Sequence, residues 1–219
     1  MITLYGSLHS RANRCAWMLR ELDLDFRHEP TNFQDGSTRK AEFLRLNPNG
    51  RVPVLDDDGF VLFESLAINL YLAKKFGGPL GPTDLQEEAL MMQWSLWVEN
   101  EVEKPLLLAA ANATLFAPDK RSAEERDVAL AKLNRPWTVL DNLLAEQPYL
   151  TGDRFTVADL NVASVMTLGP IARIDLTAFA NLDAWLMRCL DRPKATDWRS
   201  VSFSIPRPPG PLGMLSMFV

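Results

Sequence analysis

The first third of the chain alternates short β-favouring runs with segments of helical periodicity. Residues 2–5 (Ile-Thr-Leu-Tyr) and 26–29 (Phe-Arg-His-Glu) are runs of the length and composition that favour strands. Between them, apolar residues recur every three or four positions, as on one face of a helix: Cys15, Met18, Leu19 and Leu22. We expect a further short helix over residues 37–46, capped by Ser37 or Thr38.

Two more strands and a helix follow. Residues 54–56 and 61–63 flank Asp57-Asp58-Gly59, a sequence typical of a hairpin turn. A helix from Ser65 should end at Phe76, because two lysines and then two glycines close it. The predicted order of elements, β-α-β-α-β-β-α, is that of an α/β thioredoxin-like domain, a small sheet covered by helices.

A run of helix-breaking residues, Gly77-Gly-Pro-Leu-Gly-Pro82, separates this domain from a second part in which the segments favour helix. We therefore expect a thioredoxin-like domain over residues 1–78, a linker over 79–86 and an all-α C-terminal helical domain over 87–219.

Local signals predict where the helices of the second domain begin and bend. Residues 83–86, 122–125 and 156–159 each have the spacing of a capping box, in which a Ser or Thr precedes an acid or amide by three positions. Pro105 should kink the first long helix, since proline cannot donate a backbone hydrogen bond. The proline-rich tail over 205–211 should be extended rather than helical.

The bulk composition argues against several classes of function. The 219 residues carry a net charge of −5 with both signs interspersed, which predicts no nucleic-acid surface. The N-terminus lacks the pattern of a signal peptide, and the most apolar stretch, residues 66–73, is too short to span a bilayer. Cys15 and Cys189 form no disulfide or zinc pattern, and with only two histidines we expect no metal site. A reducing cytoplasm is the expected location.

The most informative chemistry lies between residues 52 and 65. Pro53 cannot donate to a sheet, so Val52 and Pro53 should lie at a strand edge, in a bend compatible with a cis bond. The backbone N–H and C=O of Val52 are then available to a ligand's main chain. Glu64 and Ser65 open a helix, where free N–H groups and a hydroxyl can bind a carboxylate while Glu64 pairs with an ammonium. Together these groups can hold a γ-glutamyl peptide by its backbone.

These motifs resemble the glutathione site of the cytosolic glutathione transferases. The likeness rests on Asn47-Pro-Asn-Gly-Arg-Val-Pro-Val-Leu with Glu64-Ser65, and extends from Thr3-Leu-Tyr-Gly-Ser to Phe155-Thr-Val-Ala-Asp-Leu. It covers residues 1 to about 200. The resemblance implies the two-domain transferase fold, glutathione as co-substrate without a metal, and a homodimer.

The resemblance also implies a protein hydroxyl that stabilises the glutathione thiolate, since the neutral thiol is a poor nucleophile. Ser10 stands four residues before Arg14, which is the spacing of serine-type transferases, so Ser10 is the first candidate. Ser7, in the same turn, and Tyr5, in the first strand, are alternatives. Simple helix capping would also explain Ser10, and the two roles are compatible.

Other residues near this turn have structural explanations. Another branch of the family uses a catalytic cysteine, but Cys15 follows Arg14 and shares an apolar helical face, which predicts a buried core thiol. His9 is adjacent to Ser10, and adjacent side chains rarely face each other, so we expect a surface histidine. Lys40 and Arg51 are candidates for the glycyl carboxylate of glutathione, although solvated surface charge explains both equally well.

We expect the electrophile to bind between the two domains. Apolar residues available to line that pocket are Trp94, Trp97, Leu107, Leu108 and Phe116. Aromatic residues on helices belong more often to the core, so most of these should be buried. Residues 212–219 could cover the pocket mouth or fray.

The function that the sequence favours is conjugation of glutathione to hydrophobic electrophiles. Ser10 would stabilise the thiolate, Val52 and Pro53 would hold the cysteinyl backbone, and Glu64 and Ser65 the γ-glutamyl group. A glutathione-dependent isomerase or peroxidase would use the same site, and a non-catalytic binding module would share the fold. We expect neither nucleic acid nor membrane as a partner.

Overall fold

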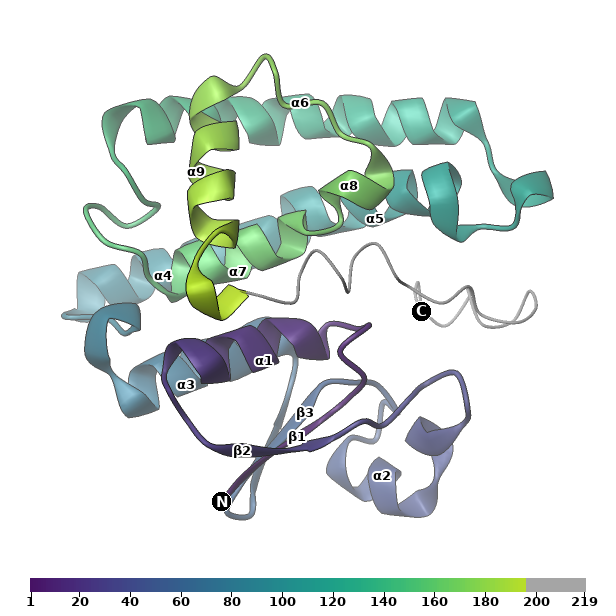
Figure 1. Cartoon of the computed structure of the whole chain (residues 1–219), viewed down its shortest axis with the longest axis vertical. Coiled ribbons are helices and arrows are strands. Elements are labelled where there is room, and N and C mark those ends of the chain that lie inside the picture. The colour runs from purple at the N-terminus through teal and green to yellow at the C-terminus, as the bar shows by residue number, and fades with distance from the viewer. Residues whose placement is uncertain (196–219) are drawn as a thin grey trace. The chain divides into compact units, whose positions relative to one another are not determined.

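The computed structural model describes residues 1–195, which fold into two compact units (Figure 1). The first unit comprises residues 1–88 and the second begins at Ala89. The expected extension over 205–211 and the segment 212–219 lie outside the described residues.

The first unit contains a four-stranded mixed sheet. Its strands are β1 (Ile2–Tyr5), β2 (Phe26–Glu29), β3 (Val54–Asp57) and β4 (Phe60–Phe63). The spatial order is β2-β1-β3-β4, in which β1 is parallel to β2 and antiparallel to β3, and β3 is antiparallel to β4. The predicted succession β-α-β-α-β-β-α is confirmed.

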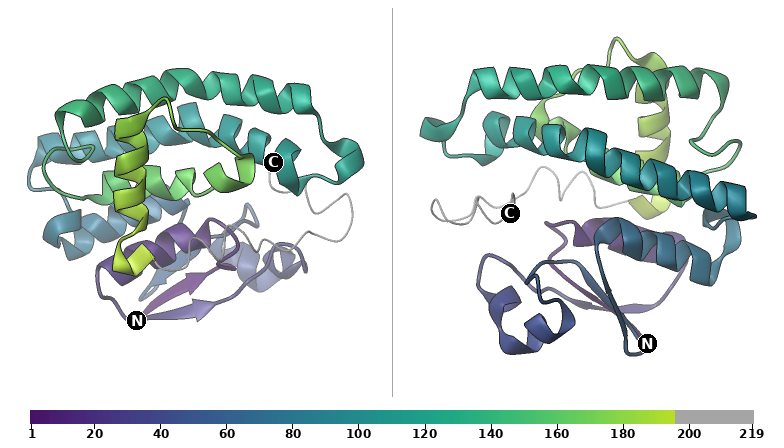
Figure 2. Two further views of the ribbon diagram at one scale, coloured as in Figure 1. Left: turned by 45° about the horizontal axis from the view of Figure 1, so that its top comes forward. Right: turned by 180° about the vertical axis from the view of Figure 1, so that it is seen from behind.

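Two helices pack together over one face of this sheet. Helices α1 (Ala12–Glu21) and α3 (Ser65–Phe76) lie side by side there, as Figures 1 and 2 show from three directions. The apolar stripe predicted for α1 is inside the core, where Cys15, Met18 and Leu19 are fully buried. This burial fixes α1 with its first turn at the carboxyl end of β1.

The hairpin between β3 and β4 closes at Asp58 and Gly59. Both residues have positive φ, 52° and 92°, as a two-residue hairpin turn requires. The Asp56 carboxylate accepts the Gly59 N–H at 2.7 Å. The predicted turn is therefore confirmed.

The single helix expected over residues 37–46 is wrong in detail. The structure has a 3₁₀ turn, η1 (Ser37–Arg39), and a short helix, α2 (Ala41–Leu46), separated by Lys40 in an extended conformation. Neither Ser37 nor Thr38 caps a helix. Ser37 instead donates its N–H to the Asp35 carboxylate at 2.8 Å, so the polar side chains organise the preceding turn.

Helices are the main elements of the second unit over the residues described, beside loops and one isolated β-bridge between Tyr149 and Gly152. Its helices are α4 (Leu85–Trp97, which starts in the first unit), α5 (Lys104–Ala110), α6 (Ala123–Glu146), α7 (Val157–Met166), α8 (Gly169–Ala172) and α9 (Ala180–Leu190). Short 3₁₀ turns occur in this unit at η5 (Pro118–Lys120) and η6 (Pro193–Ala195), and a further one, η2 (Gly78–Leu80), lies near the end of the first unit.

Pro105 lies just after a change of helix type in the run from α4 to α5, and the kink expected there stays a prediction. A π-helical segment, η3 (Val98–Glu103), immediately precedes α5, in which Pro105 is the second residue. Because proline has no N–H for the carbonyl four residues earlier, a wider turn in this place removes the conflict. A second π-helical segment, η4 (Ala111–Leu115), follows α5.

Two of the three predicted helix starts are confirmed. The Ser122 hydroxyl accepts the Glu125 N–H at 3.1 Å, and Thr156 with Asp159 forms a complete capping box. The prediction for residues 83–86 is wrong by one position. Asp84 accepts the Glu87 N–H at 2.8 Å, while the Glu87 carboxylate reaches back to Thr83. Asp is the stronger cap of the two neighbouring candidates, which explains the shift.

Asp159 also joins three elements of the second unit. Its carboxylate accepts the N–H groups of Leu150 and Thr156 and the indole N–H of Trp185, each at 2.9 Å. Burial raises the pKa of this carboxyl, and the hydrogen bonds act in the opposite direction. The capping box therefore also anchors α9 and the loop before α7.

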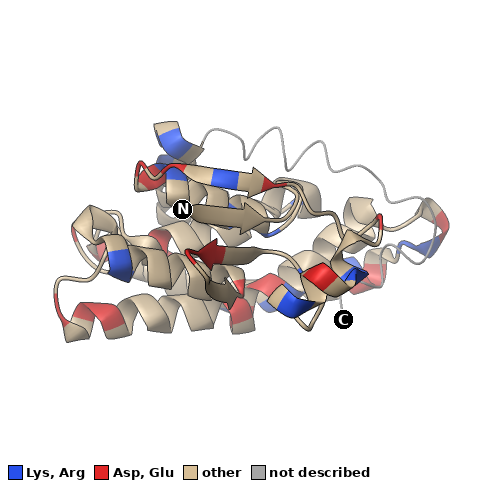
Figure 3. Cartoon of the chain, turned by 90° about the horizontal axis from the view of Figure 1, so that it is seen from below, with Lys and Arg blue, Asp and Glu red and all other residues tan. Residues whose placement is uncertain are grey.

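The charged residues of both units are of mixed sign, as Figure 3 shows. Among residues 1–195, no helix has the length and apolar character needed to cross a membrane. Over the same residues, no three metal-binding side chains come together.

Candidate functional site

The bond between Val52 and Pro53 is cis, and it directly precedes the sheet. Strand β3 begins at Val54, which pairs with Tyr5 of β1, so Val52 lies beyond the last ladder pair. Pro53 is buried and Val52 is half-buried. The backbone of Val52 therefore extends past the edge of the ladder at the end of β1, where the sequence predicted a strand-like binding edge.

Asn47 holds the loop that leads to this edge. It is buried, and its side-chain amide donates to the Arg51 carbonyl at 2.8 Å. Its side-chain oxygen accepts the Asn49 N–H at 3.0 Å, and its backbone carbonyl accepts the Gly50 N–H at 2.9 Å. The position of Val52 thus depends on the Asn47 side chain. Asn47 belongs to the motif noted in the sequence, but no role was predicted for it.

Glu64 and Ser65 form the junction between β4 and α3. Glu64 is exposed and has φ of 74°, a conformation that side chains other than glycine rarely adopt. Its carbonyl accepts the Ile68 N–H at 2.9 Å, the first bond of α3. Strained residues of this kind concentrate at ligand sites, and here the strain directs an acidic side chain to the surface at a helix N-terminus.

Ser65 is buried and contacts α1. Its hydroxyl accepts a hydrogen bond from the Arg14 guanidinium at 3.4 Å, and its carbonyl accepts the Cys15 thiol at 3.6 Å. Arg14 is itself buried, in the first turn of α1. The first turns of α1 and α3 therefore meet through Arg14 and Ser65, and the positive ends of both helix dipoles lie close together.

Arg14 is a residue whose role the sequence analysis missed. From the sequence, Arg14 was used only to identify Ser10, which stands four residues before it. In the structure, Arg14 is the hydrogen-bond partner of Ser65. The available signal was an arginine beside the buried, apolar stripe of α1. A charged group in such a place needs a specific partner.

Ser10 occupies the turn before α1. Its hydroxyl accepts the Ala12 N–H at 3.2 Å and donates to the Ser7 carbonyl at 2.6 Å. The Ser10 N–H bonds to the same carbonyl at 3.0 Å. Ser10 is half-buried and stands one position before the N-cap of α1, Arg11, which makes no side-chain cap bond itself. The Ser10 hydroxyl therefore serves as the cap by satisfying the first N–H of the helix.

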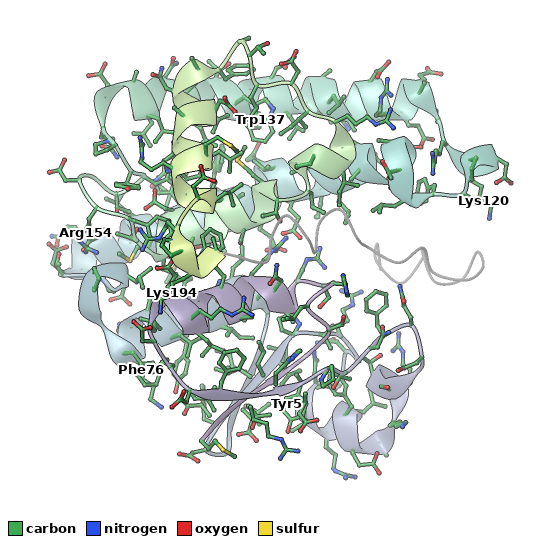
Figure 4. The ribbon with its side chains drawn as sticks, viewed as in Figure 1. Tyr5, Phe76, Lys120, Trp137, Arg154 and Lys194 are labelled. Atoms are coloured by element: carbon green, nitrogen blue, oxygen red, sulfur yellow. The ribbon has the colours of Figure 1, made fainter. Side chains whose placement is uncertain are left out.

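The alternative sulfur donors lie in different surroundings. The Ser7 hydroxyl accepts the His9 N–H at 3.2 Å, within the same turn. Tyr5, labelled in Figure 4, packs its ring edge-on against Phe43 of α2 with a centroid separation of 6.4 Å. Tyr5 thus has a packing role at the end of β1.

Cys15 and His9 have the environments expected of them. Cys15 is fully buried, and burial raises the pKa of its thiol, although the Arg14 charge acts in the opposite direction. A thiol in that state is a poor nucleophile. His9 is exposed.

Gly6 is the point at which the two halves of the site meet. It has φ of 136°, and a Cβ placed on it would lie 2.7 Å from the Ala12 Cβ and 3.0 Å from the Val52 Cβ. Only a residue without a side chain permits this approach. The turn that carries Ser10 and the edge that carries Val52 are therefore neighbours.

The structure brings Arg39, rather than Lys40, to the loop before Val52. A Cβ placed on Gly50 would lie 2.9 Å from an Arg39 guanidinium nitrogen, so this side chain lies against the loop. Lys40 is exposed, and its charge contributes to the lowered pKa of Asp35, which is caused chiefly by hydrogen bonds from Ser37. Arg51 is exposed beside Gly50. Arg39 was not among the candidates chosen from the sequence.

The apolar residues suggested for an electrophile pocket are distributed unevenly. Trp94 and Leu107 are buried, and Trp94 packs edge-on against Trp97 with a centroid separation of 5.2 Å. Phe116 is half-buried. Leu108 lines an open groove of about 330 Å³ in the second unit, together with Ser122, Glu124, Glu125 and Val128. A pocket between the two domains stays a prediction.

Comparison with protein families decides the assignment. The family model described as glutathione S-transferase, N-terminal domain, matches residues 1–74, and the model for the C-terminal domain of the same family matches residues 104–193. The chain belongs to the glutathione S-transferase family. The resemblance and fold class inferred from the sequence are thus confirmed.

Individual glutathione S-transferases match over nearly the whole chain. Glutathione S-transferase 3 of Zea mays is 33% identical over 222 residues, covering 96% of this chain and 97% of the relative. Glutathione S-transferase D7 of Drosophila melanogaster is 31% identical over 199 residues, covering 89% and 85%. The theta class enzyme of Xanthomonas axonopodis pv. citri, solved with glutathione bound, superposes with a TM-score of 0.84 at 27% identity and covers 94% of this chain and 99% of that one.

Proposed function

We propose that this glutathione S-transferase conjugates glutathione to hydrophobic electrophiles, with Ser10 stabilising the thiolate. The observation that carries the proposal is the close approach of Gly6, Ala12 and Val52, which makes the Ser10 turn and the Val52 edge neighbours. A ligand paired with the Val52 backbone would then have its next group beside Ser10.

The γ-glutamyl end of glutathione is assigned to the junction of β4 and α3. The α-carboxylate would accept hydrogen bonds from the Ser65 N–H and hydroxyl at the helix N-terminus. The buried Arg14 adds positive charge behind Ser65. The exposed Glu64 carboxylate would pair with the α-ammonium. Glutathione bound to the Xanthomonas relative supports the choice of ligand.

The cysteinyl part of glutathione would pair with the N–H and C=O of Val52, as an added strand pairs with a sheet edge. Pro53 has no N–H, so this position donates no hydrogen bond to a neighbouring strand of the sheet. The sulfur would then lie at the first turn of α1, where the helix dipole favours an anion.

Ser10 would act by changing its hydrogen-bond acceptor. Its hydroxyl proton now goes to the Ser7 carbonyl, and rotation about the Cα–Cβ bond can redirect it to sulfur. One pK unit of thiol depression corresponds to about 1.4 kcal/mol, which a charge-assisted hydrogen bond and a helix terminus can supply together. The thiolate then attacks the electrophilic carbon. In a substitution the new C–S bond replaces the bond to the leaving group, which departs with its electron pair. In an addition the displaced electron pair takes up a proton from water, and neither route forms a covalent bond to the enzyme.

The glycyl carboxylate is assigned to Arg39. Its guanidinium lies against Gly50, two residues before Val52 along the chain. Arg51 is next to Gly50 in the sequence, whereas the charge of Lys40 acts on the Asp35 carboxylate. A guanidinium can bind a carboxylate through two parallel hydrogen bonds, which favours Arg39 further.

One observation favours a second candidate function, a non-catalytic glutathione-binding module. Both hydrogen bonds of the Ser10 hydroxyl are to the backbone of its own turn, and they fully explain the residue as a cap. An isomerase or peroxidase would use the same groups as the conjugating enzyme.

The Ser10→Ala substitution separates catalysis from capping. We expect turnover with an activated aryl halide to fall by about tenfold or more, with glutathione affinity changed by less than about threefold, because the hydroxyl contacts only sulfur. The substitution also costs about 1 kcal/mol of unfolding free energy through the lost cap.

Ser10→Asp is the matched control for capping. It restores stability to the helix end but leaves turnover low, since a carboxylate repels the thiolate. Full activity in both variants would contradict the role of Ser10.

Two neighbouring substitutions test the glycyl assignment. Arg39→Gln should weaken glutathione binding by about fivefold, because a charge-assisted hydrogen bond contributes about 1 kcal/mol at an exposed site. Lys40→Gln should change affinity by less than about twofold. Calorimetric titration of glutathione measures both, and a larger loss in Lys40→Gln than in Arg39→Gln would reverse the assignment.

We further propose that the protein is a homodimer whose interface includes one face of α4. Leu85, Met92 and Leu96 are 75%, 48% and 58% exposed. Their spacing places them on the same side of the helix. Such a stripe is unusual on a free surface.

Size-exclusion chromatography with light scattering tests this arrangement. The double substitution Met92→Glu and Leu96→Glu should shift a dimer to a monomer, since two buried carboxylates per chain would face their counterparts. Val139→Glu, on α6 and 41% exposed, is the control and should leave the mass unchanged. A monomeric wild-type protein would refute the proposal.

A further inference from the structure

The carbonyl of Gly6 accepts a hydrogen bond from a histidine side chain. The Nε2 atom of His28 lies 2.8 Å from this oxygen. A carbonyl oxygen can only accept, so Nε2 carries the proton. His28 is half-buried on β2, where its backbone pairs with Leu4 of β1.

This carbonyl needs a side-chain donor because the backbone N–H that would pair with it is turned away, although the Ser7 N–H still donates to the Thr31 carbonyl at 2.9 Å. The Gly6 N–H donates to the Glu29 carbonyl at 2.8 Å, so a continued parallel ladder would pair the Gly6 carbonyl with the Thr31 N–H. The chain bends at Pro30, and the Thr31 N–H donates to Glu29 instead, at 2.7 Å. A buried carbonyl without a donor costs free energy, and His28 supplies the missing bond.

The orientation of this peptide group affects the turn that carries Ser10. The Gly6 carbonyl and the Ser7 N–H belong to one planar peptide unit. The carbonyl of Ser7, in turn, accepts both the N–H and the hydroxyl of Ser10, at 3.0 and 2.6 Å. A rotation of the Gly6–Ser7 peptide would therefore displace the Ser10 hydroxyl.

Gly6 cannot fix that orientation by itself. With φ of 136° and no side chain, its backbone has more conformational freedom than any other residue would have in this place. Three hydrogen bonds limit the freedom on this side: the Gly6 N–H donates to the Glu29 carbonyl, the Ser7 N–H donates to the Thr31 carbonyl at 2.9 Å, and His28 donates to the Gly6 carbonyl. His28 thus holds one end of the Gly6–Ser7 peptide and the Thr31 carbonyl holds the other.

We propose that His28 is a positioning residue for the sulfur site. By holding the Gly6 carbonyl, it fixes the turn of Ser7 and Ser10 beside the Val52 edge. The inference rests on the proposed function, since it concerns the site at which the glutathione thiolate would be stabilised. His28 does not contact glutathione in this account and acts only through the backbone of Gly6.

A positioning role differs measurably from a purely structural one. If His28 only joined β1 to β2, its loss would lower the unfolding free energy and leave the ionisation of bound glutathione unchanged. If it positions Ser10, its loss also raises the pKa of the bound thiol, because the donor is no longer directed at sulfur.

The experiment compares His28→Met, which has no donor, with His28→Gln, whose amide nitrogen can occupy the place of Nε2. The probe is glutathione bound to the full-length protein, and the readout is the ultraviolet absorbance of its thiolate as a function of pH, with S-methylglutathione as the blank. Arg27→Gln is the control, because Arg27 neighbours His28 on β2, is exposed and pairs with Glu29.

In His28→Met we expect the thiol pKa to rise by about one unit, a roughly tenfold loss of thiolate at a given pH below it. Glutathione affinity should change by less than about threefold, since the Val52 and Ser65 contacts remain. His28→Gln and Arg27→Gln should stay within about 0.3 units of the wild type.

A folded His28→Met variant with the wild-type thiol pKa would overturn the inference, as would equal shifts in His28→Met and His28→Gln. If His28→Met fails to fold, His28→Asn replaces it, because its shorter amide does not reach Gly6. Failure of the wild-type protein to bind glutathione would contradict the proposed function itself and this inference with it. Binding without a difference among the variants contradicts the inference alone.

Discussion

The close packing around Gly6 is the constraint on which the site depends. The end of β1, the first turn of α1 and the edge before β3 approach one another so closely that a Cβ on Gly6 would overlap the Ala12 Cβ. The sheet register places β1 between β2 and β3, so both neighbours of β1 contribute to the site. The strand on one side gives the Val52 edge, and the strand on the other gives the His28 side chain.

Helix termini supply the electrostatic character of the site. The starts of α1 and α3 meet through Arg14 and Ser65, so two positive dipole ends and one buried guanidinium are close together in a chain whose net charge is −5. The exposed, strained Glu64 places a negative charge beside them. This pairing of opposite charges suits a ligand that carries both an ammonium and a carboxylate, as the γ-glutamyl group does.

The sequence was sufficient where the determining interactions are local. The hairpin at Asp58 and Gly59 and the caps at Ser122 and Thr156 depend on residues within three positions of each other, and all were predicted. The cap of α4 was placed on Thr83 because its neighbour Asp84 offers the same chemistry, and only the structure shows which of the two accepts the bond.

Contacts between distant segments could not be predicted in the same way. Arg39 lies against Gly50, eleven positions away, and the expected helix over 37–46 breaks at Lys40; neither feature was visible in the local pattern. Arg14 and Ser65 are 51 positions apart, and His28 and Gly6 are 22 apart. Their pairing depends on how the helices and strands pack, which periodicity does not specify.

The most direct test of the central claim is a calorimetric titration of glutathione into the wild-type protein and its Ser65→Ala variant. The account predicts saturable binding to one site per chain in the wild type. In the variant, affinity should fall by about tenfold, since one charge-assisted hydrogen bond contributes about 1.4 kcal/mol. Absence of binding by the wild type, or equal affinity in a folded Ser65→Ala variant, would contradict it.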